Sequence, residues 1–315
     1  MAAHHGGIQG GVLMQLNVLE PNRNADGRRL PPWLKRPLPT GDVLLQTRRI
    51  VADSGIATVC EEARCPNLSE CWSHRHATFM ILGDRCTRRC HFCAVTTAKP
   101  DPVKTDEPRR LAEAVQRLAL RHVVITAVAR DDLPDEGAGH FAACVSEIRR
   151  TTPDCAIEVL PADFHARDEL LAKLVEAGPD IYNHNQETVE RLSPSIRPQA
   201  RYRRTLEVLR MVKVKQPRMW TKSGLMVGLG ETRDELYRTM QDLRNVGVDI
   251  LTVGQYLRPS EDHAPVARYV PPDEFDEIGE EARALGFASV ASGPFVRSSY
   301  NAAEVYEAID RRRRA

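Results

Sequence analysis

Six of the eight cysteines in this 315-residue chain lie between residues 60 and 93. They form a first triplet spaced C-x4-C-x5-C (Cys60, Cys65 and Cys71) and a second triplet spaced C-x3-C-x2-C (Cys86, Cys90 and Cys93). Three thiolates on a short loop suit an iron–sulfur cluster, because each sulfur can hold a different corner iron. A four-iron cluster with three such ligands keeps one iron open for chemistry. The two triplets therefore predict two clusters and an enzyme that uses them.

Other uses of cysteine fit this pattern less well. A disulfide framework is typical of small secreted domains, whereas this chain is long and 42% hydrophobic. Zinc is the stronger alternative, since His74, His76 and His91 lie near the triplets and could complete tetrahedral sites. Zinc-binding segments favour paired C-x2-C arms, however, and neither triplet offers two. A zinc-stabilised binding module is the alternative from another class, and metal analysis would distinguish it.

The composition argues against nucleic-acid and membrane partners. The 44 basic and 43 acidic residues leave a net charge of +1, so no global field attracts a polyanion. No apolar run approaches the roughly 20 residues that span a bilayer. Residues 1–58 are rich in Gly, Pro, Arg and Asn, and we expect them to form an irregular extension. This extension lacks the pattern of a transit peptide, and free thiols need a reducing compartment, so a cytoplasmic location is expected.

Short apolar runs alternate with helical patterns along the rest of the chain, which is typical of parallel βα units. Six strands are expected, over residues 78–83, 122–127, 156–160, 181–183, 223–228 and 250–255. Helices are expected over residues 111–120, 140–150, 168–177 and 232–245. Six units are too few for the usual closed eight-stranded barrel, and periodicity alone supports only an α/β fold. The second triplet follows the first strand, at the end where barrel enzymes keep their active sites.

The second triplet resembles the cluster-binding motif of the radical S-adenosylmethionine (SAM) superfamily. Further motifs narrow the resemblance to the lipoyl synthases, and they extend from Cys60 to Tyr300. They read CEEARCPN at 60–67, ECW at 70–72, ATFMILGD at 77–84, VIT at 124–126, RDDL at 130–133, NHN at 183–185, TKSGLMVGLGET at 221–232 and RSSY at 297–300. The chain departs from the family pattern at residues 73–76 and at Ala129, where an aspartate is common. Both departures fall near the expected cavity.

The resemblance implies a partial (β/α)6 TIM-like barrel with N-terminal and C-terminal extensions. The chain would divide into the irregular extension 1–58, an auxiliary-cluster segment 59–77, the radical SAM barrel 78–286 and a C-terminal segment 287–315 that ends in a basic tail. Two [4Fe-4S] clusters are also implied. The second triplet would hold the cluster that binds and cleaves SAM, and the first triplet would hold an auxiliary cluster together with Ser299 of the RSSY motif. From the residues alone, a capped turn before the helix expected near Ala302 explains that serine more simply.

The reaction implied by the resemblance is the insertion of two sulfur atoms at C6 and C8 of a protein-bound octanoyl-lysine. SAM would supply radicals, and the auxiliary cluster would be sacrificed as the sulfur source. The expected partners are octanoylated lipoyl carrier domains (E2 subunits of 2-oxoacid dehydrogenases and the glycine cleavage H protein), reduced ferredoxin or flavodoxin, and an iron–sulfur carrier. A methylthiotransferase is the alternative radical enzyme, but its usual RNA-binding domain has no counterpart after Tyr300.

Six residues are candidates to contact SAM. Four lie at or just after predicted strand ends, where they would either line the cavity or serve ordinary turns. These are Thr126, Arg130, Glu158 and Asn185. Met226 belongs to the segment that the resemblance places beside SAM. Phe92 lies between two cluster ligands, where it would shield the cluster, stack on adenine or simply pack its loop.

Other polar and cysteine residues are interpreted more plainly. Asp131 and Asp132 are expected to order their loop, with Arg130 as an ion-pair partner. His184 is expected to be a hydrogen-bonded structural histidine. Cys144 and Cys155 stand apart from the triplets and are expected to be buried packing thiols.

Overall fold

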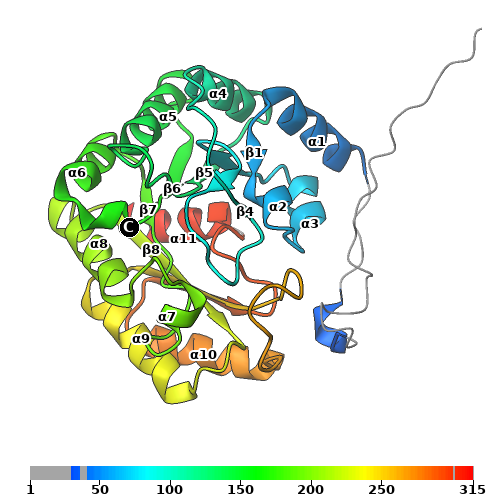
Figure 1. Ribbon diagram of the computed structural model, residues 1–315, viewed down its shortest axis with the longest axis vertical. Coiled ribbons are helices and arrows are strands. Elements are labelled where there is room, and N and C mark those ends of the chain that lie inside the picture. The colour runs from blue at the N-terminus through cyan, green and yellow to red at the C-terminus, as the bar shows by residue number, and fades with distance from the viewer. Residues whose placement is uncertain (1–29, 36–40, 301, 315) are drawn as a thin grey trace, which may run out of the picture.

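One eight-stranded sheet forms the centre of the molecule. In the computed structural model, which describes residues 30–35, 41–300 and 302–314, the strand order is β1-β2-β5-β6-β7-β8-β9-β10. The seven strands from β2 to β10 run parallel, and β1 pairs antiparallel with β2. Within the described residues β1 and β10 do not pair with each other, so the sheet curves without closing (Figure 1). The strands are β1 (Ala57–Thr58), β2 (Thr78–Ile81), β5 (His122–Ala127), β6 (Ala156–Leu160), β7 (Ile181–Asn183), β8 (Trp220–Val227), β9 (Ile250–Gln255) and β10 (Ser289–Gly293).

The partial barrel expected from the sequence is confirmed, and its sheet has two strands more than expected, the antiparallel β1 and the parallel β10. All six predicted strands are present, and β8 begins at Trp220 rather than at residue 223. The additional parallel strand is β10, where the sequence indicated only a C-terminal segment. Its residues S-V-A-S-G have mostly small side chains with weak strand preference. It is positioned by pairing along its whole length with β9, from Ser289 opposite Ile250 to Gly293 opposite Gly254.

Helices cover the outer face of the sheet (Figure 1). They are α4 (Glu107–Arg117), α5 (Ala138–Thr151), α6 (Asp168–Glu176), α8 (Tyr202–Lys215), α9 (Arg233–Asn245) and α10 (Pro272–Ala284), with η2 (Phe164–Ala166) and α7 (Ser193–Ile196) as short turns between them. Because side chains alternate along a strand, residues such as Ile125 and Leu251 pack outward against these helices in two apolar clusters. Their neighbours Val124 and Thr252 point to the inside of the barrel. The four predicted helices are all present.

The N-terminal extension is less irregular than the sequence suggested. Helix α1 (Asp42–Ser54) lies within residues 1–58 and ends at Gly55, whose backbone adopts the left-handed conformation with φ of 61°. The prediction of an irregular segment was therefore wrong for this part. The buried face of α1 includes the polar residues Thr47 and Ser54, so the helix lacks a clear apolar periodicity in the sequence. Thr47 can be buried because its hydroxyl donates to the carbonyl of Trp72 at 2.9 Å. Residues 1–29 and 36–40 of the extension lie outside the described residues.

Short elements carry the two cysteine triplets. After η1 (Pro32–Leu34), the first triplet lies on α2 (Val59–Glu62), on the turn that follows it, and on α3 (Leu68–Ser73). The second triplet lies on a loop framed by β3 (Arg85–Cys86) and β4 (Thr96–Thr97), which pair parallel to each other. This small ladder fixes both ends of the loop directly beyond the C-terminal end of β2.

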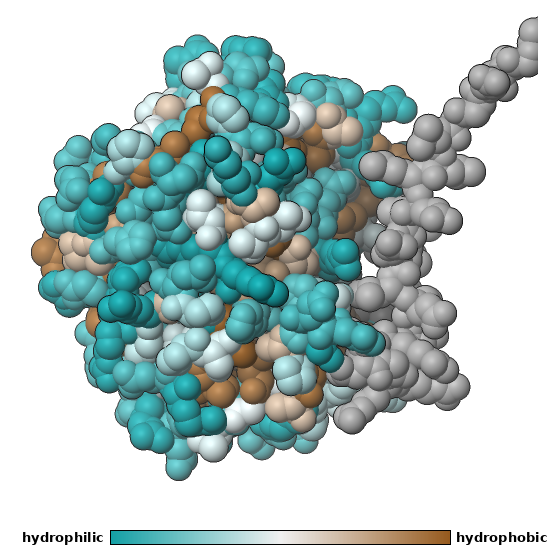
Figure 2. All heavy atoms as spheres, viewed as in Figure 1, coloured by the Kyte–Doolittle hydropathy of each residue, from teal (hydrophilic) through white to brown (hydrophobic). Residues whose placement is uncertain are grey.

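Helix α11 (Ala302–Arg314) closes the opposite end of the barrel. Its Ile309 packs against Ile181 and Ile250, the first residues of β7 and β9, and Trp220 at the start of β8 joins the same cluster. The expected basic tail at residues 311–314 continues this helix. None of the described helices is long and apolar enough to cross a bilayer. Viewed down the barrel, the surface is mostly hydrophilic, and apolar side chains show in small separate patches (Figure 2).

Candidate active site

The second cysteine triplet lies at the C-terminal ends of the barrel strands. Cys86 follows β2, and its sulfur accepts hydrogen bonds from the backbone N–H of Arg88 at 3.4 Å and of Ala129 at 3.3 Å. Cys90 and Cys93 lie close enough for the thiol charges of the triplet to act on one another. Backbone donors to sulfur stabilise a thiolate that carries a metal. The loop therefore has both the ligands and the hydrogen bonds that an iron–sulfur cluster needs.

Burial favours the neutral thiol at three of the six cysteines. It raises the pKa of Cys90 to about 11 and the pKa of Cys93 to about 12. In the first triplet, burial likewise raises the pKa of Cys60 to about 11. A bound metal supplies the positive charge that stabilises the thiolates, so cluster binding must release protons from these side chains.

A buried arginine anchors the loop of the second triplet. Arg88 forms a two-armed ion pair with Asp131, with its Nη2 2.7 Å from Oδ1 and its Nε 2.9 Å from Oδ2. The same Nη2 lies 2.7 Å from Asp163, which also binds Arg204 at 3.1 Å. The predicted loop-ordering role of Asp131 thus has a geometric basis, although its partner is Arg88. Arg130 pairs with Asp132 instead, at 2.9 Å.

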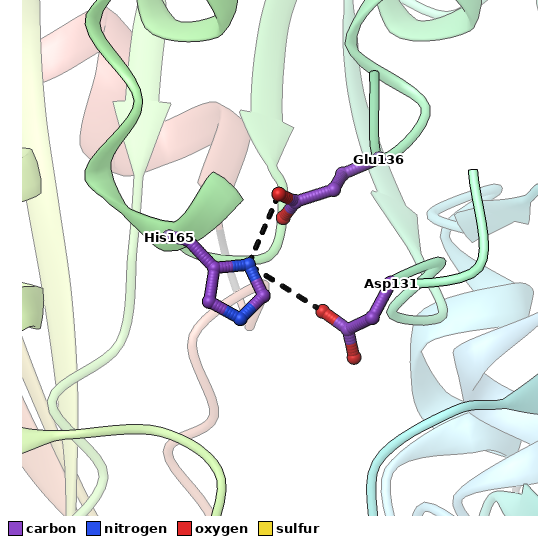
Figure 3. Close-up of side chains that lie close together, drawn as sticks. All are labelled: Asp131, Glu136 and His165. Atoms are coloured by element: carbon purple, nitrogen blue, oxygen red, sulfur yellow. Dashed lines mark ion pairs between the residues drawn. The ribbon is translucent and has the colours of Figure 1, made fainter. Parts of the chain in front are cut away.

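Two further groups extend this anchor (Figure 3). His165 places its Nδ1 3.0 Å from Glu136 and 3.8 Å from Asp131. The ligand atoms of these three residues all lie within 4.8 Å of one another. A cation there would have to displace Arg88, because Arg88 and the hydroxyl of Thr87 already occupy both oxygens of Asp131. We interpret the trio as part of the ion-pair network that holds the cysteine loop.

The first triplet lines a cavity at the other end of the barrel. Cys60, Cys65 and Cys71 share this cavity with Ser299, which lies more than 200 residues later in the chain. The walls include the first residues of β2 and β5 and the start of α11. The remaining lining residues are Val59, Asn67, His76, Ala77, Thr78, His122, Val124, Arg297, Tyr300, Ala302 and Ala303. Three thiols and one hydroxyl in one cavity match the donor set expected for an auxiliary cluster.

The serine-bearing segment is attached to the cysteine loop on both sides of Ser299. Before the serine, the side-chain N–H of Asn67 donates to the carbonyl of Phe295 at 2.6 Å. After it, the hydroxyl of Tyr300 donates to Glu70 at 3.1 Å. The spacing of the cysteines gave no indication of these contacts, which join residues some 230 positions apart.

The separation of the sulfur atoms argues against zinc. A tetrahedral zinc ion with bonds of 2.3 Å requires its sulfur ligands to lie about 3.8 Å apart. In the described part of the chain, neither triplet forms a group whose ligand atoms all lie within 4.8 Å of one another. His91 and His74, the suggested additional ligands, hydrogen-bond to the carbonyls of Ser195 at 2.7 Å and Glu70 at 3.0 Å. Corner irons of a four-iron cluster accommodate wider spacing than a single ion does.

The two triplets thus lie at opposite ends of the barrel strands. The second triplet lies at the C-terminal strand ends, as the sequence predicted. The first triplet lies at the N-terminal ends, one strand length away, or about 13 Å for a four-residue strand such as β2. A molecule inside the barrel would be reached from both ends.

Thr126 and Asn185, two of the predicted SAM contacts, follow the barrel strands toward their C-terminal ends. Thr126 and Asn185 are on the inner side of the barrel, and the side-chain oxygen of Asn185 is buried without a hydrogen-bond partner in the described structure. Asn185 donates to Glu187 at 3.1 Å, and Glu187 is close enough to raise the pKa of Cys90 and Cys93. The sequence analysis missed Glu187; the left-handed φ of 65° at this residue is visible only in the structure.

Two of the other predicted SAM contacts pack in an apolar cluster, and a third forms hydrogen bonds within its own loop. Phe92 and Met226 pack against the same apolar cluster, formed by Ile196, Leu229 and Tyr256. Arg130 is 2% exposed and donates to Asp132 and to the carbonyl of Leu82 at 3.1 Å. Its side chain therefore orders the loop beyond β5. His184 is structural, as expected: its Nδ1–H donates to the carbonyl of Pro161 at 3.1 Å, and burial lowers its pKa to about 4.

Glu158 is engaged inside the barrel rather than at its mouth. Its carboxylate lies 3.0 Å from Lys222 and accepts a hydrogen bond from Asn183 at 2.7 Å. Both Glu158 and Lys222 are almost completely buried. A buried carboxylate requires such partners, because an isolated charge is costly in a low-dielectric interior. The sequence pattern placed Glu158 near a strand end but could not indicate which charge it would pair with.

Breaking this ion pair should have a large effect on stability. Lys222→Met removes the ammonium group that pairs with the buried Glu158, and we expect the free energy of unfolding in urea to fall by about 3–5 kcal/mol. The double variant Glu158→Met/Lys222→Met should lose less than this single variant. Lys215→Met is the control, since Lys215 pairs with a largely exposed Asp168. A loss as small for Lys222→Met as for the control would contradict the assignment.

Comparison with known proteins shows the family of this chain. Residues 14–65 match the family model for the N-terminal domain of lipoyl synthase, and residues 80–243 match the radical SAM superfamily model. A lipoyl synthase of Rubrobacter xylanophilus is 53% identical over 288 residues, covering 91% of this chain and 90% of that protein. A lipoyl synthase of Methylococcus capsulatus is 54% identical over 275 residues, covering 87% and 85%. The chain belongs to the lipoyl synthase family.

Solved structures add support for the fold alone. SuiB of Streptococcus suis, bound to its precursor peptide SuiA, matches with a TM-score of 0.52 at 12% identity, over 72% of this chain and 52% of SuiB. HydG, a maturase of the [FeFe]-hydrogenase, matches with a TM-score of 0.50 at 15% identity, over 84% of this chain and 71% of HydG. Both are too distant in sequence to say which residues carry function.

The two departures expected from the resemblance lie near the two cysteine triplets. Ala129 contacts the loop of the second triplet through its backbone. Its carbonyl accepts hydrogen bonds from the N–H and the hydroxyl of Thr87, and its N–H donates to the sulfur of Cys86. A missing aspartate side chain therefore leaves the loop contacts intact. The departure at residues 73–76 lies at the end of α3, where His76 lines the first cavity and its pKa is lowered by burial.

Proposed function

We propose that this lipoyl synthase family member inserts two sulfur atoms at C6 and C8 of an octanoyl-lysine. The observation that carries the proposal is the pairing of two ligand sets at opposite ends of one barrel. One set is the second cysteine triplet; the other is the first triplet with Ser299. A substrate carbon between them would lie within reach of both a radical source and a sulfur source. Holding reactants in such an arrangement removes much of the entropic barrier to reaction.

The cofactors would be SAM and two [4Fe-4S] clusters, which fit the residues present. When bound, the cluster at the second triplet would supply the electron that cleaves SAM to methionine and a 5′-deoxyadenosyl radical. The auxiliary cluster would supply the sulfur atoms that replace hydrogen. Cys86, Cys90 and Cys93 would hold the SAM-binding cluster. Cys60, Cys65 and Cys71 would hold the auxiliary one. The Ser299 oxygen is a harder donor than thiolate and would hold its iron less firmly, as suits a cluster that is consumed.

Residues around the second triplet would position SAM. We propose Thr126, Asn185 and Met226 as contacts. Thr126 lies near the C-terminal end of β5, Asn185 donates to Glu187, and Met226 packs against the same apolar cluster as Phe92. We add Glu187 for its proximity to Cys90 and Cys93. The unpartnered oxygen of Asn185 offers an acceptor. Phe92 packs beside Met226 and would shield this end from water.

Two candidates have weaker support. Arg130 would act indirectly, by holding the loop that supplies the N–H donor to Cys86. Glu158 has both carboxylate oxygens in ion-pair contact with Lys222, so we leave it out of the SAM site.

The substrate would be carried by a protein. We propose octanoylated lipoyl carrier domains, namely E2 subunits of 2-oxoacid dehydrogenases and the glycine cleavage H protein, as substrates. Reduced ferredoxin or flavodoxin would supply electrons, and an iron–sulfur carrier would restore the auxiliary cluster. Because six reduced thiols need a reducing compartment, we propose a cytoplasmic location.

The test is anaerobic incubation of the reconstituted protein with SAM, a reductant and an octanoyl-lysyl peptide, followed by mass spectrometry. We expect a product that carries two added sulfur atoms, with methionine and 5′-deoxyadenosine formed alongside. Repeating the assay with an intact octanoylated carrier domain controls for a peptide that is too short to bind. Cleavage of SAM without sulfur addition to either substrate would contradict the proposed function.

A further inference from the structure

Asn67 occupies a capping position but does not act as a cap. It is the residue before α3, where asparagine ordinarily accepts a hydrogen bond from the first turn of the helix. Here the side chain makes no such bond. Its N–H instead reaches across to the carbonyl of Phe295, at 2.6 Å. Asn67 is 1% exposed, so its side-chain N–H has lost its water partners and bonds to the distant Phe295 carbonyl instead.

The acceptor of this hydrogen bond, Phe295, lies four residues before Ser299 in the chain. Phe295 and Val296 lie where the chain leaves β10 and passes over β9. The passage is tight, because a Cβ added to Gly254 would lie 2.0 Å from the carbonyl oxygen of Val296. A close approach of this kind requires glycine on β9. The hydroxyl of Tyr300 then fixes the far side of the segment to Glu70.

Asn67 therefore connects the two halves of the first cluster site. It lies between Cys65 and Cys71 in sequence and lines the same cavity as these cysteines and Ser299. Its side-chain oxygen is buried without a hydrogen-bond partner in the described structure, so the residue is retained at the cost of an unsatisfied acceptor. A residue that served only to cap α3 would have no reason to bear that cost.

We propose that Asn67 is the positioning residue that presents Ser299 to the auxiliary cluster. The inference rests on the proposed function, in which the first triplet and Ser299 hold that cluster. Asn67 touches the backbone of the serine segment rather than the iron. Its amide donor sets how far the segment stands from the three cysteines, and so decides whether the serine oxygen reaches the fourth iron.

Two substitutions separate positioning from capping. Asn67→Ser and Asn67→Asp both place good N-cap residues before α3, so the helix should form normally. Serine is too short to reach Phe295, and an ionised aspartate has no proton to donate to its carbonyl. Both variants should release the segment. Asn245→Ala, at an exposed site on α9, is the control for a general effect of losing an asparagine.

The first readout needs no cluster. Hydrogen–deuterium exchange of the metal-free protein should show about tenfold faster exchange over residues 296–300 in both variants, as expected for loss of one buried hydrogen bond. Residues 86–93 should exchange as in the parent. Equal acceleration at both regions, or none at 296–300, would overturn the proposal, since a merely structural role would loosen the whole protein.

The second readout reports on the iron itself. In a Cys86→Ala/Cys90→Ala/Cys93→Ala background only the auxiliary cluster should remain. Mössbauer spectra of this protein reconstituted with 57Fe should then show one iron site whose spectrum differs from that of the other three. The Asn67 variants should lose this distinct iron, as the Ser299→Ala variant should. Variants that keep it would overturn the role of Asn67 while leaving the proposed function intact. A background protein that binds no cluster would overturn the proposed function itself.

Discussion

Cys65→Ala is expected to abolish sulfur insertion while SAM cleavage continues. Cys65 lines the first cavity and is one of three cysteines that hold the auxiliary cluster in our account. Product should fall by more than roughly 10³-fold, since losing a direct ligand exceeds the 10–100-fold cost typical of outer-shell changes. Formation of 5′-deoxyadenosine should persist, because the second triplet lies at the other end of the barrel. Mass spectrometry of the peptide and chromatography of the nucleoside measure the two activities in one reaction.

Cys144→Ala is the matched control for this prediction. Cys144 is fully buried in the main core cluster and far from both triplets in sequence. Removing its sulfur should lower stability by about 1–2 kcal/mol, as small core truncations do, without loss of iron or activity. If Cys65→Ala also stopped SAM cleavage, the two triplets would not be independent sites, and their separation by the barrel would have no functional meaning.

Cys90→Ala is expected to abolish both activities. Cys90 belongs to the triplet beyond β2, and without it the SAM-binding cluster loses one of three ligands. Neither methionine nor sulfur-containing product should form above background. Iron content should fall from about eight to about four atoms per chain, because the auxiliary cluster keeps its ligands. Iron analysis and SAM turnover, measured on the same preparation, give the result.

The pair of variants is more informative than either alone. Cys65→Ala and Cys90→Ala should each leave about four irons, yet only the first should cleave SAM. Equal loss of SAM cleavage in both would contradict the assignment of the second triplet as the only SAM site. Retention of eight irons in Cys90→Ala would show that another residue had replaced the ligand.

Much of the barrel could be predicted because its strands are short apolar runs separated by helices. β10 could not, since its small residues carry little strand preference and its position depends on pairing with β9. Helix α1 was missed because Thr47 and Ser54 lie on its buried face, where their hydroxyls satisfy backbone carbonyls. In both cases tertiary contacts decided the local structure.

The cysteine ligands were the most predictable part of the site, because thiol spacing is a local property. Ser299 was predicted only through the resemblance, and its approach to the first triplet depends on contacts with Asn67 and Glu70 that no local pattern encodes. Glu158 has a contact that its local sequence pattern does not reveal. Its place near a strand end suggested the cavity, whereas Lys222 on a strand that comes 64 residues later neutralises it.

The central claim is that the first triplet and Ser299 hold the source of both sulfur atoms. The most direct test reconstitutes the protein with 34S-sulfide, removes free sulfide, and analyses the product of a single turnover by mass spectrometry. Our account predicts that both inserted sulfurs are 34S, with at most one product molecule per chain, and that Cys65→Ala gives none. A product containing natural-abundance sulfur, or a labelled product from Cys65→Ala, would contradict it.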